Sequence, residues 1–325
     1  MAQLTSTHVR ALELDASAYP RHMLHAEERV WVEKNCYIDI WLEVIHAVGC
    51  DPMAVLPFVV AIDFEDDQWT FFKPPHGELW ELYGIDVQEL NVWRPLVEHA
   101  IEHVGAGKLI STEADAWWLP DTSGTDYRTQ HTKTTIVINE LDLERQRLGY
   151  FHNAGYHVLE GEDFARTFRI GEAKDPAFMP LFAELVKVDR IVRRDRSELV
   201  ARSREALKLH LARRPATDPV AKFRARWERD LPWLTERGLG FYHAWAFGTI
   251  RQLGAAAELA SLYATWAFGD DSAAEAFAQV SQAAKTMILK AARAVNAKRA
   301  LDAAPIFDAM QSGWARGTDA LARHA

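Results

Sequence analysis

The stretch EKNCYIDIWLEVIHAVG, residues 33–49, joins a cysteine to the pattern of an amphipathic helix. Its apolar residues recur every three or four positions, and a glycine closes the run. Asn35 is a good N-cap residue, which places Cys36 in the first turn, where unpaired backbone amides favour thiolate over thiol. The stretch therefore predicts a nucleophilic cysteine at neutral pH, with a small buried core residue as the alternative.

The composition is that of a globular protein with room for two domains. The chain has 325 residues, of which 49% are hydrophobic and 26% are charged. The N-terminus lacks the apolar run of a signal peptide, and no stretch approaches the roughly 18 apolar residues of a membrane span. We therefore expect a cytoplasmic location and no membrane partner. Cys36 and Cys50 are too few for a disulfide framework, so both are expected to be free thiols.

The secondary-structure pattern changes along the chain. In residues 1–175, helical patterns alternate with β-rich runs, including 55–64, 68–72 and three more between 108 and 161. Beyond them alanine, leucine and arginine dominate with helical periodicity, which is typical of a bundle. We predict an α+β fold, with a catalytic domain at 1–175 and an α-helical domain at 176–325.

A nucleophilic cysteine needs a base, and the base needs an orienting group. His131 directly follows a polar loop and opens a predicted strand, from which its ring could reach a helix start. Asn153 comes at the end of the partner strand and could fix the tautomer of the imidazole without adding charge. His152 competes with it, because adjacent strand residues face opposite sides and only one of the two points at the site.

The order of cysteine at a helix start, histidine at a strand start and amide on the next strand is that of papain-like enzymes. The short motifs that carry the likeness are NC at 35–36, DAWWLP at 115–120, His131 before TTIVI, and LGYFHNAG at 148–155. On these motifs the N-terminal part resembles the cysteine-peptidase-like acyltransferase domain of the butirosin biosynthesis protein H family. The whole chain, including RQLGAAAELASLY at 251–263, is similar to a bacterial family often encoded near amino acid:carrier protein ligases.

The resemblance implies a papain-like fold and a reaction. An aminoacyl group would pass from the 4'-phosphopantetheine thioester of a carrier protein to a small amine acceptor through a Cys36 thioester. His131 would be the general base and acid, and Asn153 the orienting group. The backbone amide of Cys36, helped by the Asn35 side chain, would hold the oxyanion. Papain-like enzymes carry a glutamine shortly before the nucleophile, and HAEERVWVEKNC has none, so the second oxyanion donor stays open.

The charge distribution suggests a docking face. Residues 1–186 carry 14 Lys and Arg against 31 Asp and Glu, whereas residues 187–226 carry 13 against 5. Arg193, Arg194 and Arg196 could contact an acidic aminoacyl carrier protein or the phosphate of its prosthetic arm. The alternative is a solvated arginine-rich helix face. Nucleic acid is not expected as a partner, because the basic run lacks interleaved aromatic residues.

Other polar residues raise smaller questions. His99 and His103 have the spacing of two metal ligands on a helix, but no third ligand is evident, so we expect neither a metal nor a cofactor bound by the chain itself. Arg251 and Gln252 interrupt an apolar helical pattern and need partners if they are buried. Arg251 could hold the two domains together or bind a carboxylate.

Two other functions remain open at this level. A cysteine peptidase or amidohydrolase would use the same three residues if water reached the thioester, and sequence does not separate hydrolysis from transfer. A non-catalytic carrier-protein-binding protein would keep the fold and the basic segment, with an inert Cys36.

Overall fold

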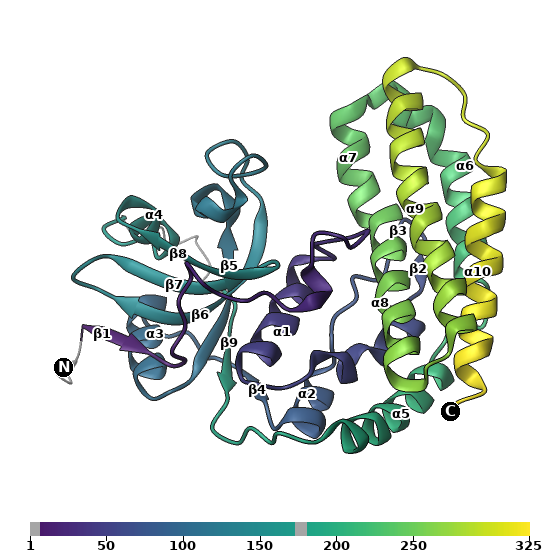
Figure 1. The fold of residues 1–325 in the computed structure, drawn as a ribbon. Coiled ribbons are helices and arrows are strands. Elements are labelled where there is room, and N and C mark those ends of the chain that lie inside the picture. Colours follow the sequence, from purple (N-terminus) through teal and green to yellow (C-terminus); the bar gives the residue numbers. More distant parts are fainter. Residues whose placement is uncertain (1–6, 173–180) are drawn as a thin grey trace. The chain divides into compact units, whose positions relative to one another are not determined.

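An antiparallel sheet forms the frame of the N-terminal half (Figure 1). Its strands lie in the order β4-β9-β5-β6-β7-β8, and β1 pairs with the outer part of β6. The strands are β1 (His8–Arg10), β4 (Asp86–Glu89), β5 (Leu109–Asp115), β6 (Lys133–Asp142), β7 (Arg147–His152), β8 (Gly155–Glu160) and β9 (Ala183–Lys187). The computed structural model describes residues 7–172 and 181–325.

Helices flank this sheet. They are η1 (Met23–His25), α1 (Cys36–Ala47), α2 (His76–Tyr83), α3 (Leu96–Gly105), η3 (Ala116–Trp118), η4 (Pro120–Thr122) and α4 (Glu162–Thr167). α1 packs on β6, β7 and β8, and α3 packs on β1, β5 and β6. Ile136, Ile138 and Tyr150 share a core with α3. Because strand residues alternate, Val137 and Phe151 face the opposite side of the sheet, where Tyr19 packs on Phe151.

The second compact unit is mostly helical. Its elements are η2 (Pro52–Ala61), the hairpin of β2 (Phe64–Glu65) and β3 (Gln68–Trp69), α5 (Arg196–Ala212), α6 (Pro219–Arg237), α7 (Leu239–Gly248), α8 (Ile250–Phe268), α9 (Asp271–Ala297) and α10 (Ala304–Ala322). The pairs α8–α9 and α9–α10 pack along their lengths. Gly313 permits the α9–α10 approach, because a Cβ there would lie 2.8 Å from the carbonyl oxygen of Ala276.

The two units are interleaved in sequence. The first comprises Met1–Ala26, Cys36–Pro52 and His76–Arg193, and the second comprises Glu27–Asn35, Met53–Pro75 and Arg194–Ala325. The chain therefore leaves one unit and enters the other at the peptide bond just before Cys36.

The structure supports the α+β class with a helical C-terminal region and corrects one expected element. Residues 55–64 were expected to form a strand, yet they lie mostly in the 3₁₀ helix η2. The prediction failed because a continuous apolar run has no period that would distinguish a buried strand from a buried helix. The expected boundary at 175/176 falls outside the described residues. The sheet continues beyond it, since β9 pairs with both β4 and β5, so the first unit extends to Arg193.

A membrane-spanning helix was not expected from the sequence. Among the helices of residues 7–172 and 181–325, none combines the length and the apolar character needed to cross a bilayer.

Candidate functional site

Cys36 is the first residue of α1 and contacts the start of β6. The Thr134 hydroxyl and the Thr135 backbone both hydrogen bond to its thiol. β7 pairs with β6 no nearer this end than Val137–Phe151, so the backbone of Thr135 is available to the cysteine. Burial raises the pKa of the Cys36 thiol above its ordinary value, although the hydrogen bonds from Thr134 and Thr135 act in the opposite direction. The raised pKa favours the thiol in this resting arrangement, and activation of Cys36 as a nucleophile stays a prediction.

Thr134 connects this thiol to a histidine. Its hydroxyl lies 2.8 Å from Nε2 of His152, the last residue of β7. By strand alternation both side chains face the side of the sheet that carries Ile136 and Tyr150, and both are buried. Thr134 therefore stands between the cysteine and an imidazole that does not touch the thiol directly.

The other ring nitrogen of His152 meets a carboxylate. Nδ1 lies 2.5 Å from Oδ2 of Asp121, and the Tyr150 hydroxyl donates to Oδ1 of the same residue at 2.5 Å. Asp121 belongs to η4, and the hydroxyl of its neighbour Thr122 pins this turn by donating to the carbonyl of Leu119 at 2.9 Å. The polar loop after β5 thus places one carboxylate under the end of β7.

The electrostatics of Asp121 fix the tautomer of the histidine. Burial by itself raises the pKa of Asp121, but the hydrogen bond and the charge of His152 outweigh it, helped by His157 and Tyr150, and the pKa lies below its ordinary value. An ionised carboxylate only accepts, so Nδ1 of His152 carries a hydrogen. Nε2 of the same ring meets the Thr134 hydroxyl, which also contacts the Cys36 thiol.

His131, expected as the base, is placed differently. Its Nδ1 lies 2.6 Å from Oδ2 of Asp115, and its ring stacks on Trp117 with 4.5 Å between centroids. Its side chain is 68% exposed. The hydrogen bonds of the Cys36 thiol go to β6, so within the described residues the expected His131–Cys36 pair is not formed. The physical reason is that Asp115, at the end of β5, and Trp117, in η3, hold the imidazole.

Asn153, expected as the orienting group, has a conformational role. It begins the turn between β7 and β8 with φ of 45°, a left-handed conformation that asparagine tolerates better than most residues. Its neighbour His152 is the residue whose ring meets the Thr134 hydroxyl.

Asn35, the expected oxyanion donor, is engaged elsewhere. Its buried side-chain amide donates to the carbonyl of Phe72 at 3.0 Å and to Oε1 of Gln252 at 3.4 Å. An amide with both contacts made inside the second unit is a structural anchor. Of the two groups expected to hold the oxyanion, only the backbone amide of Cys36 is therefore retained.

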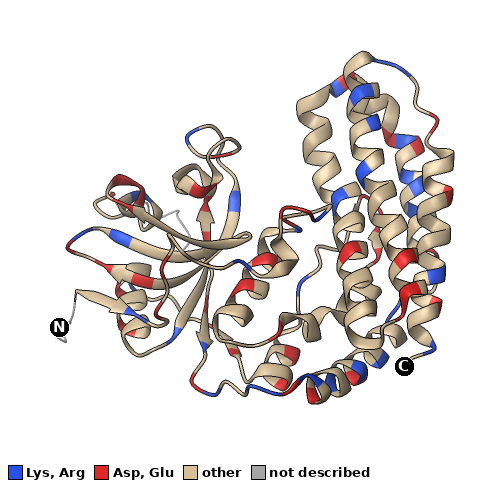
Figure 2. Cartoon of the chain, in the orientation of Figure 1, with Lys and Arg blue, Asp and Glu red and all other residues tan. Residues whose placement is uncertain are grey.

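The three arginines expected at a docking face all have partners within the chain. Each donates a hydrogen bond at short range: Arg193 to the carbonyl of Val48 at 2.9 Å, Arg194 to the carboxylate of Glu198 at 2.9 Å, and Arg196 to the carbonyl of Trp266 at 2.8 Å. Figure 2 shows that acidic residues accompany the basic ones along α5. Carrier docking stays a prediction.

A second buried polar cluster lies beneath α1. His25 is hydrogen bonded through Nδ1 to Glu43 and through Nε2 to Asp39 at 3.0 Å, and Tyr19 donates to Glu43 at 2.8 Å. Burial raises the pKa of Glu43, but the hydrogen bond and the charge of His25 outweigh it and lower the pKa. Asp39 also raises the pKa of the Cys36 thiol through its charge. The cluster thus opposes a resting thiolate.

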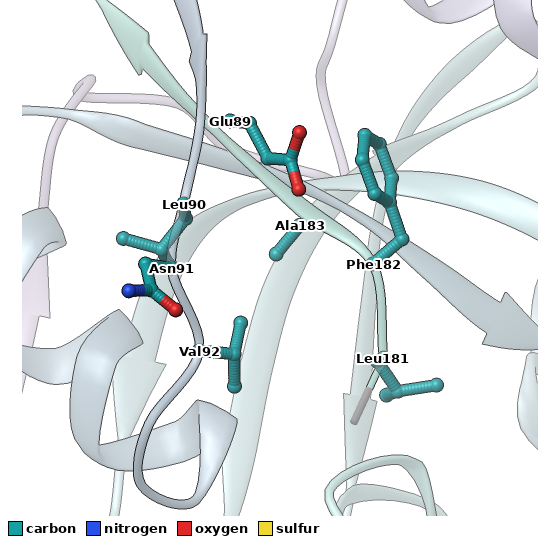
Figure 3. A pocket seen from close by; sticks show the side chains of 7 residues that line it. All are labelled: Glu89, Leu90, Asn91, Val92, Leu181, Phe182 and Ala183. Carbon is teal, nitrogen blue, oxygen red and sulfur yellow. The ribbon is translucent and has the colours of Figure 1, made fainter. Parts of the chain in front are cut away.

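A hollow elsewhere on the first unit has no chemistry of its own. It lies where β4 ends and β9 begins, and Figure 3 shows the side chains that line it: Glu89, Leu90, Asn91, Val92, Leu181, Phe182 and Ala183. Glu89 is the one ionisable residue that Figure 3 labels. None of the labelled residues belongs to the Cys36–Thr134–His152–Asp121 chain.

Metal binding has no visible support in the described part of the chain. Among residues 7–172 and 181–325, no group of three or more His, Cys, Asp or Glu side chains is arranged to hold an ion. His99 and His103 stack in parallel, with 6.2 Å between ring centroids.

Two members of the site were missed by sequence reasoning. Asp121 was hidden in a polar loop with several acids, and Thr134 was taken as an ordinary strand residue. The sequence signals that could have indicated these residues are the LPD turn for Asp121 and the pair of threonines at the start of a strand for Thr134. Both patterns are common, and neither predicts a site unless the fold is known. What the geometry defines is a row of contacts from a half-buried cysteine at a helix start through a buried threonine and a buried histidine to an aspartate, in a protein with an α+β unit and a helical unit.

The comparisons with known proteins give the family. Residues 20–188 match the DUF1839 N-terminal domain and residues 196–323 match the DUF1839 C-terminal domain. These matches cover most of the chain, which therefore belongs to the DUF1839 family. No curated protein matches it.

Proposed function

We propose that this protein is a cysteine-dependent acyltransferase with a papain-like first unit. It would move an aminoacyl group from the phosphopantetheine thioester of a carrier protein to an amine acceptor through a Cys36 thioester. The observation that carries the proposal is the continuous hydrogen-bonded chain from Cys36 through Thr134 and His152 to Asp121.

The hydrogen-bonded chain from Cys36 to Asp121, which we call the relay, supplies a proton path for acylation. As the sulfur of Cys36 attacks the thioester carbonyl, its proton passes to the Thr134 oxygen while the threonine proton passes to Nε2 of His152. Asp121 stabilises the imidazolium that forms and keeps the ring oriented. When the tetrahedral intermediate collapses, the carbon–sulfur bond to the donor breaks, and the proton returns along the same path to the departing pantetheine thiolate.

The second half-reaction reverses the proton flow. The amine attacks the carbonyl of the Cys36 thioester and loses a proton, and the departing Cys36 sulfur regains one through Thr134. An amide forms, a thioester breaks and the resting thiol is restored. The relay explains how a thiol whose pKa is raised by burial can react, because deprotonation accompanies attack.

The start of α1 offers the donor for the oxyanion. The first amides of a helix have no partner within it, and the positive end of the helix dipole favours developing negative charge. The backbone amide of Cys36 keeps the role expected for it. The Asn35 side chain is left out, because its hydrogen bonds point to Phe72 and Gln252.

The proposed site departs from the papain-like order, because the positions that the resemblance gives to histidine and to the amide or acid carry other residues. At the strand start, where the resemblance calls for histidine, Thr134 meets the thiol. At the end of the following strand, where an amide or acid is expected, His152 stands, and Asp121 comes from the preceding loop. The proposed base, the imidazole of His152, therefore does not touch the thiol, and the Thr134 hydroxyl lies between the two groups.

The proposed donor rests on the resemblance and on charge. Residues 187–226 are strongly basic, and carrier proteins are acidic. Arg202 and Lys208 on α5 expose 42% and 49% of their side chains, more than Arg194 with 11%. Replacing Arg202 and Lys208 by glutamate should weaken binding of an aminoacyl carrier protein, with a steeper loss at low salt. Unchanged binding would remove this docking face.

The relay is tested by two variants at one position. Thr134→Val keeps the shape of the side chain and removes the hydroxyl, whereas Thr134→Ser keeps the hydroxyl. Incubation with an aminoacyl pantetheine thioester and a trapping amine, followed by intact-mass analysis, should show acyl-Cys36 formation slowed about a hundredfold in T134V and within a few-fold of wild type in T134S. Equal rates in the two variants would contradict the relay. The product, amide or free acid, separates transferase from hydrolase.

A further inference from the structure

Helix α8 binds the segment that leads into Cys36. Residues 27–35 have little regular structure, yet they belong to the same compact unit as the helical bundle. The polar residues of α8 that bind this segment are Arg251 and Gln252, which interrupt its apolar sequence pattern, and Glu258. Together they take up backbone donors, backbone acceptors and one side-chain amide of the segment.

Glu258 holds the middle of the segment. Its carboxylate accepts from the backbone amide of Val30 at 2.8 Å and from that of Trp31 at 3.1 Å. Glu258 is buried, so the two amides are the partners that offset its desolvation. One carboxylate thereby fixes two consecutive peptide planes.

The end of the segment is held from the first turn of α8. Arg251 donates to the carbonyl oxygens of Glu33 at 2.9 Å and Lys34 at 3.1 Å. Oε1 of Gln252 accepts from the side chain of Asn35. The three residues immediately before Cys36 are therefore all bound by two consecutive residues of one helix.

Packing locks the same segment in register. The indole of Trp31 is buried against α8, and its Nε1 donates to Ser281 of α9 at 3.0 Å. A Cβ on Gly254 would lie 2.4 Å from the Trp31 ring, so this position admits only glycine. Trp31 packs on Gly254, between the hydrogen bonds of Arg251 and those of Glu258, so the segment cannot shift along α8.

We infer that Arg251, Gln252 and Glu258 are positioning residues for Cys36, which act by fixing the segment 27–35 and with it the first turn of α1. The inference rests on the proposed function in taking Cys36 as the reacting group. The covalent path is short, since Asn35 is bound to α8 and is joined by one peptide bond to the cysteine. The first turn of a helix frays readily, because its amides lack partners within the helix. An anchor at the preceding residues suppresses that fraying.

The consequence concerns how the thiol is presented. Its contacts with Thr134 and Thr135 require the first turn of α1 to be closed. If the anchor loosens, Cys36 gains solvent and loses these contacts together. Because burial is the larger influence on its pKa, the thiol would become more acidic and more open to reagents, yet less able to pass its proton to Thr134. Reagent labelling and acyl transfer should therefore change in opposite directions.

The experiment uses the full chain with Arg251→Ala, Arg251→Lys and Glu258→Gln. Iodoacetamide labelling of Cys36 is followed by peptide mass spectrometry from pH 6 to 10, and acyl-Cys36 formation is measured beside it. We expect R251A and E258Q to shift the labelling profile of Cys36 to lower pH and to label it several-fold faster at neutral pH, with acyl-Cys36 formation slowed. R251K should lie between R251A and wild type, because an ammonium can still reach one carbonyl.

Asp230→Asn is the matched control. Asp230 is a buried carboxylate of the same unit that accepts from Arg226 of α6 at 2.5 Å and from Trp245 of α7 at 2.9 Å. Its loss should destabilise the helical unit and leave the Cys36 labelling profile unchanged. A folded R251A whose profile superimposes on that of wild type, or a D230N profile shifted as far as that of E258Q, would overturn the inference.

This outcome is separable from that of the proposed function. Labelling needs no acyl donor, so the profile reports the position of Cys36 even if transfer is never detected. If T134V and T134S behave alike, the relay fails while the labelling shift in R251A still supports the anchor.

Discussion

The first unit contains two histidine–aspartate pairs with the same atoms in contact and opposite surroundings. In each, Nδ1 of the imidazole meets Oδ2 of the carboxylate, at 2.6 Å for His131–Asp115 and 2.5 Å for His152–Asp121. The side chains of the former are 68% and 37% exposed, whereas those of the latter are 1% and 6% exposed. Residue type and pairing geometry are therefore shared, and burial is what differs.

The difference teaches which pair can take part in a proton relay. An exposed pair exchanges protons with solvent and is screened by it, so its contribution to stability is small. A buried pair has a fixed tautomer, and its remaining nitrogen is directed at one partner, here Thr134. Only the second pair is connected to the cysteine by hydrogen bonds. The contrast leads to four predictions.

The largest expected effect is on stability. Asp121→Ala removes the carboxylate under His152 and Tyr150 and leaves two buried donors unpaired, which should cost about 3–5 kcal/mol. Asp115→Ala, its exposed counterpart, should cost less than about 1 kcal/mol. Native-state hydrogen exchange at the amides of β6 and β7 reports the first unit directly. Similar losses in the two variants would show that burial does not distinguish the pairs.

The pH dependence of the Asp121 contribution has a definite sign. Its pKa is lowered in the folded protein, so the stabilisation is complete above its ordinary value of about 3.9 and is lost as the pH falls through the folded value. The difference in free energy of unfolding between wild type and Asp121→Asn should therefore be constant near neutral pH and shrink only in strong acid. A difference in free energy of unfolding that shrinks as the pH falls from 8 to 6 would argue against an ionised Asp121.

The third prediction concerns catalysis. His152→Gln should slow acyl-Cys36 formation by about a hundredfold to ten-thousandfold, because it removes the proton acceptor of the relay. His131→Gln should leave the rate within a few-fold of wild type, because its ring is held by Asp115 and Trp117. The reverse order of effects, measured by intact mass with one acyl donor, would restore His131 as the base.

The smallest expected effect is on thiol reactivity. Because burial raises the pKa of Cys36, its iodoacetamide labelling at pH 7 should be slower than that of free cysteine and should rise at more alkaline pH than for the free amino acid. His131→Ala should leave the profile unchanged. Fast labelling below pH 7 that depends on His131 would indicate a preformed thiolate–imidazolium pair and contradict the relay.

The sequence could identify the cysteine but not its partners. Its place in the first turn of a helix follows from local periodicity and a nearby glycine, and the structure starts α1 at that residue. The choice between His131 and His152 depends on where the ends of β6 and β7 meet the helix, which is a matter of register. Asp121 lies in a loop whose turn is fixed by the hydrogen bond from Thr122 to Leu119, and no periodic sequence pattern predicts such a contact.

By itself, then, the sequence determined the elements with a strong period: helix α1 with Cys36 at its start, the strands around TTIVI and LGYFH, and the helical C-terminal region. Tertiary structure alone decided that Thr134 and His152 meet, that Asp115 captures His131, and that α8 binds the segment before Cys36. The physical reason is that periodicity reports which face of an element is buried, whereas a site depends on which buried faces are brought together and on the hydrogen bonds that must be completed there.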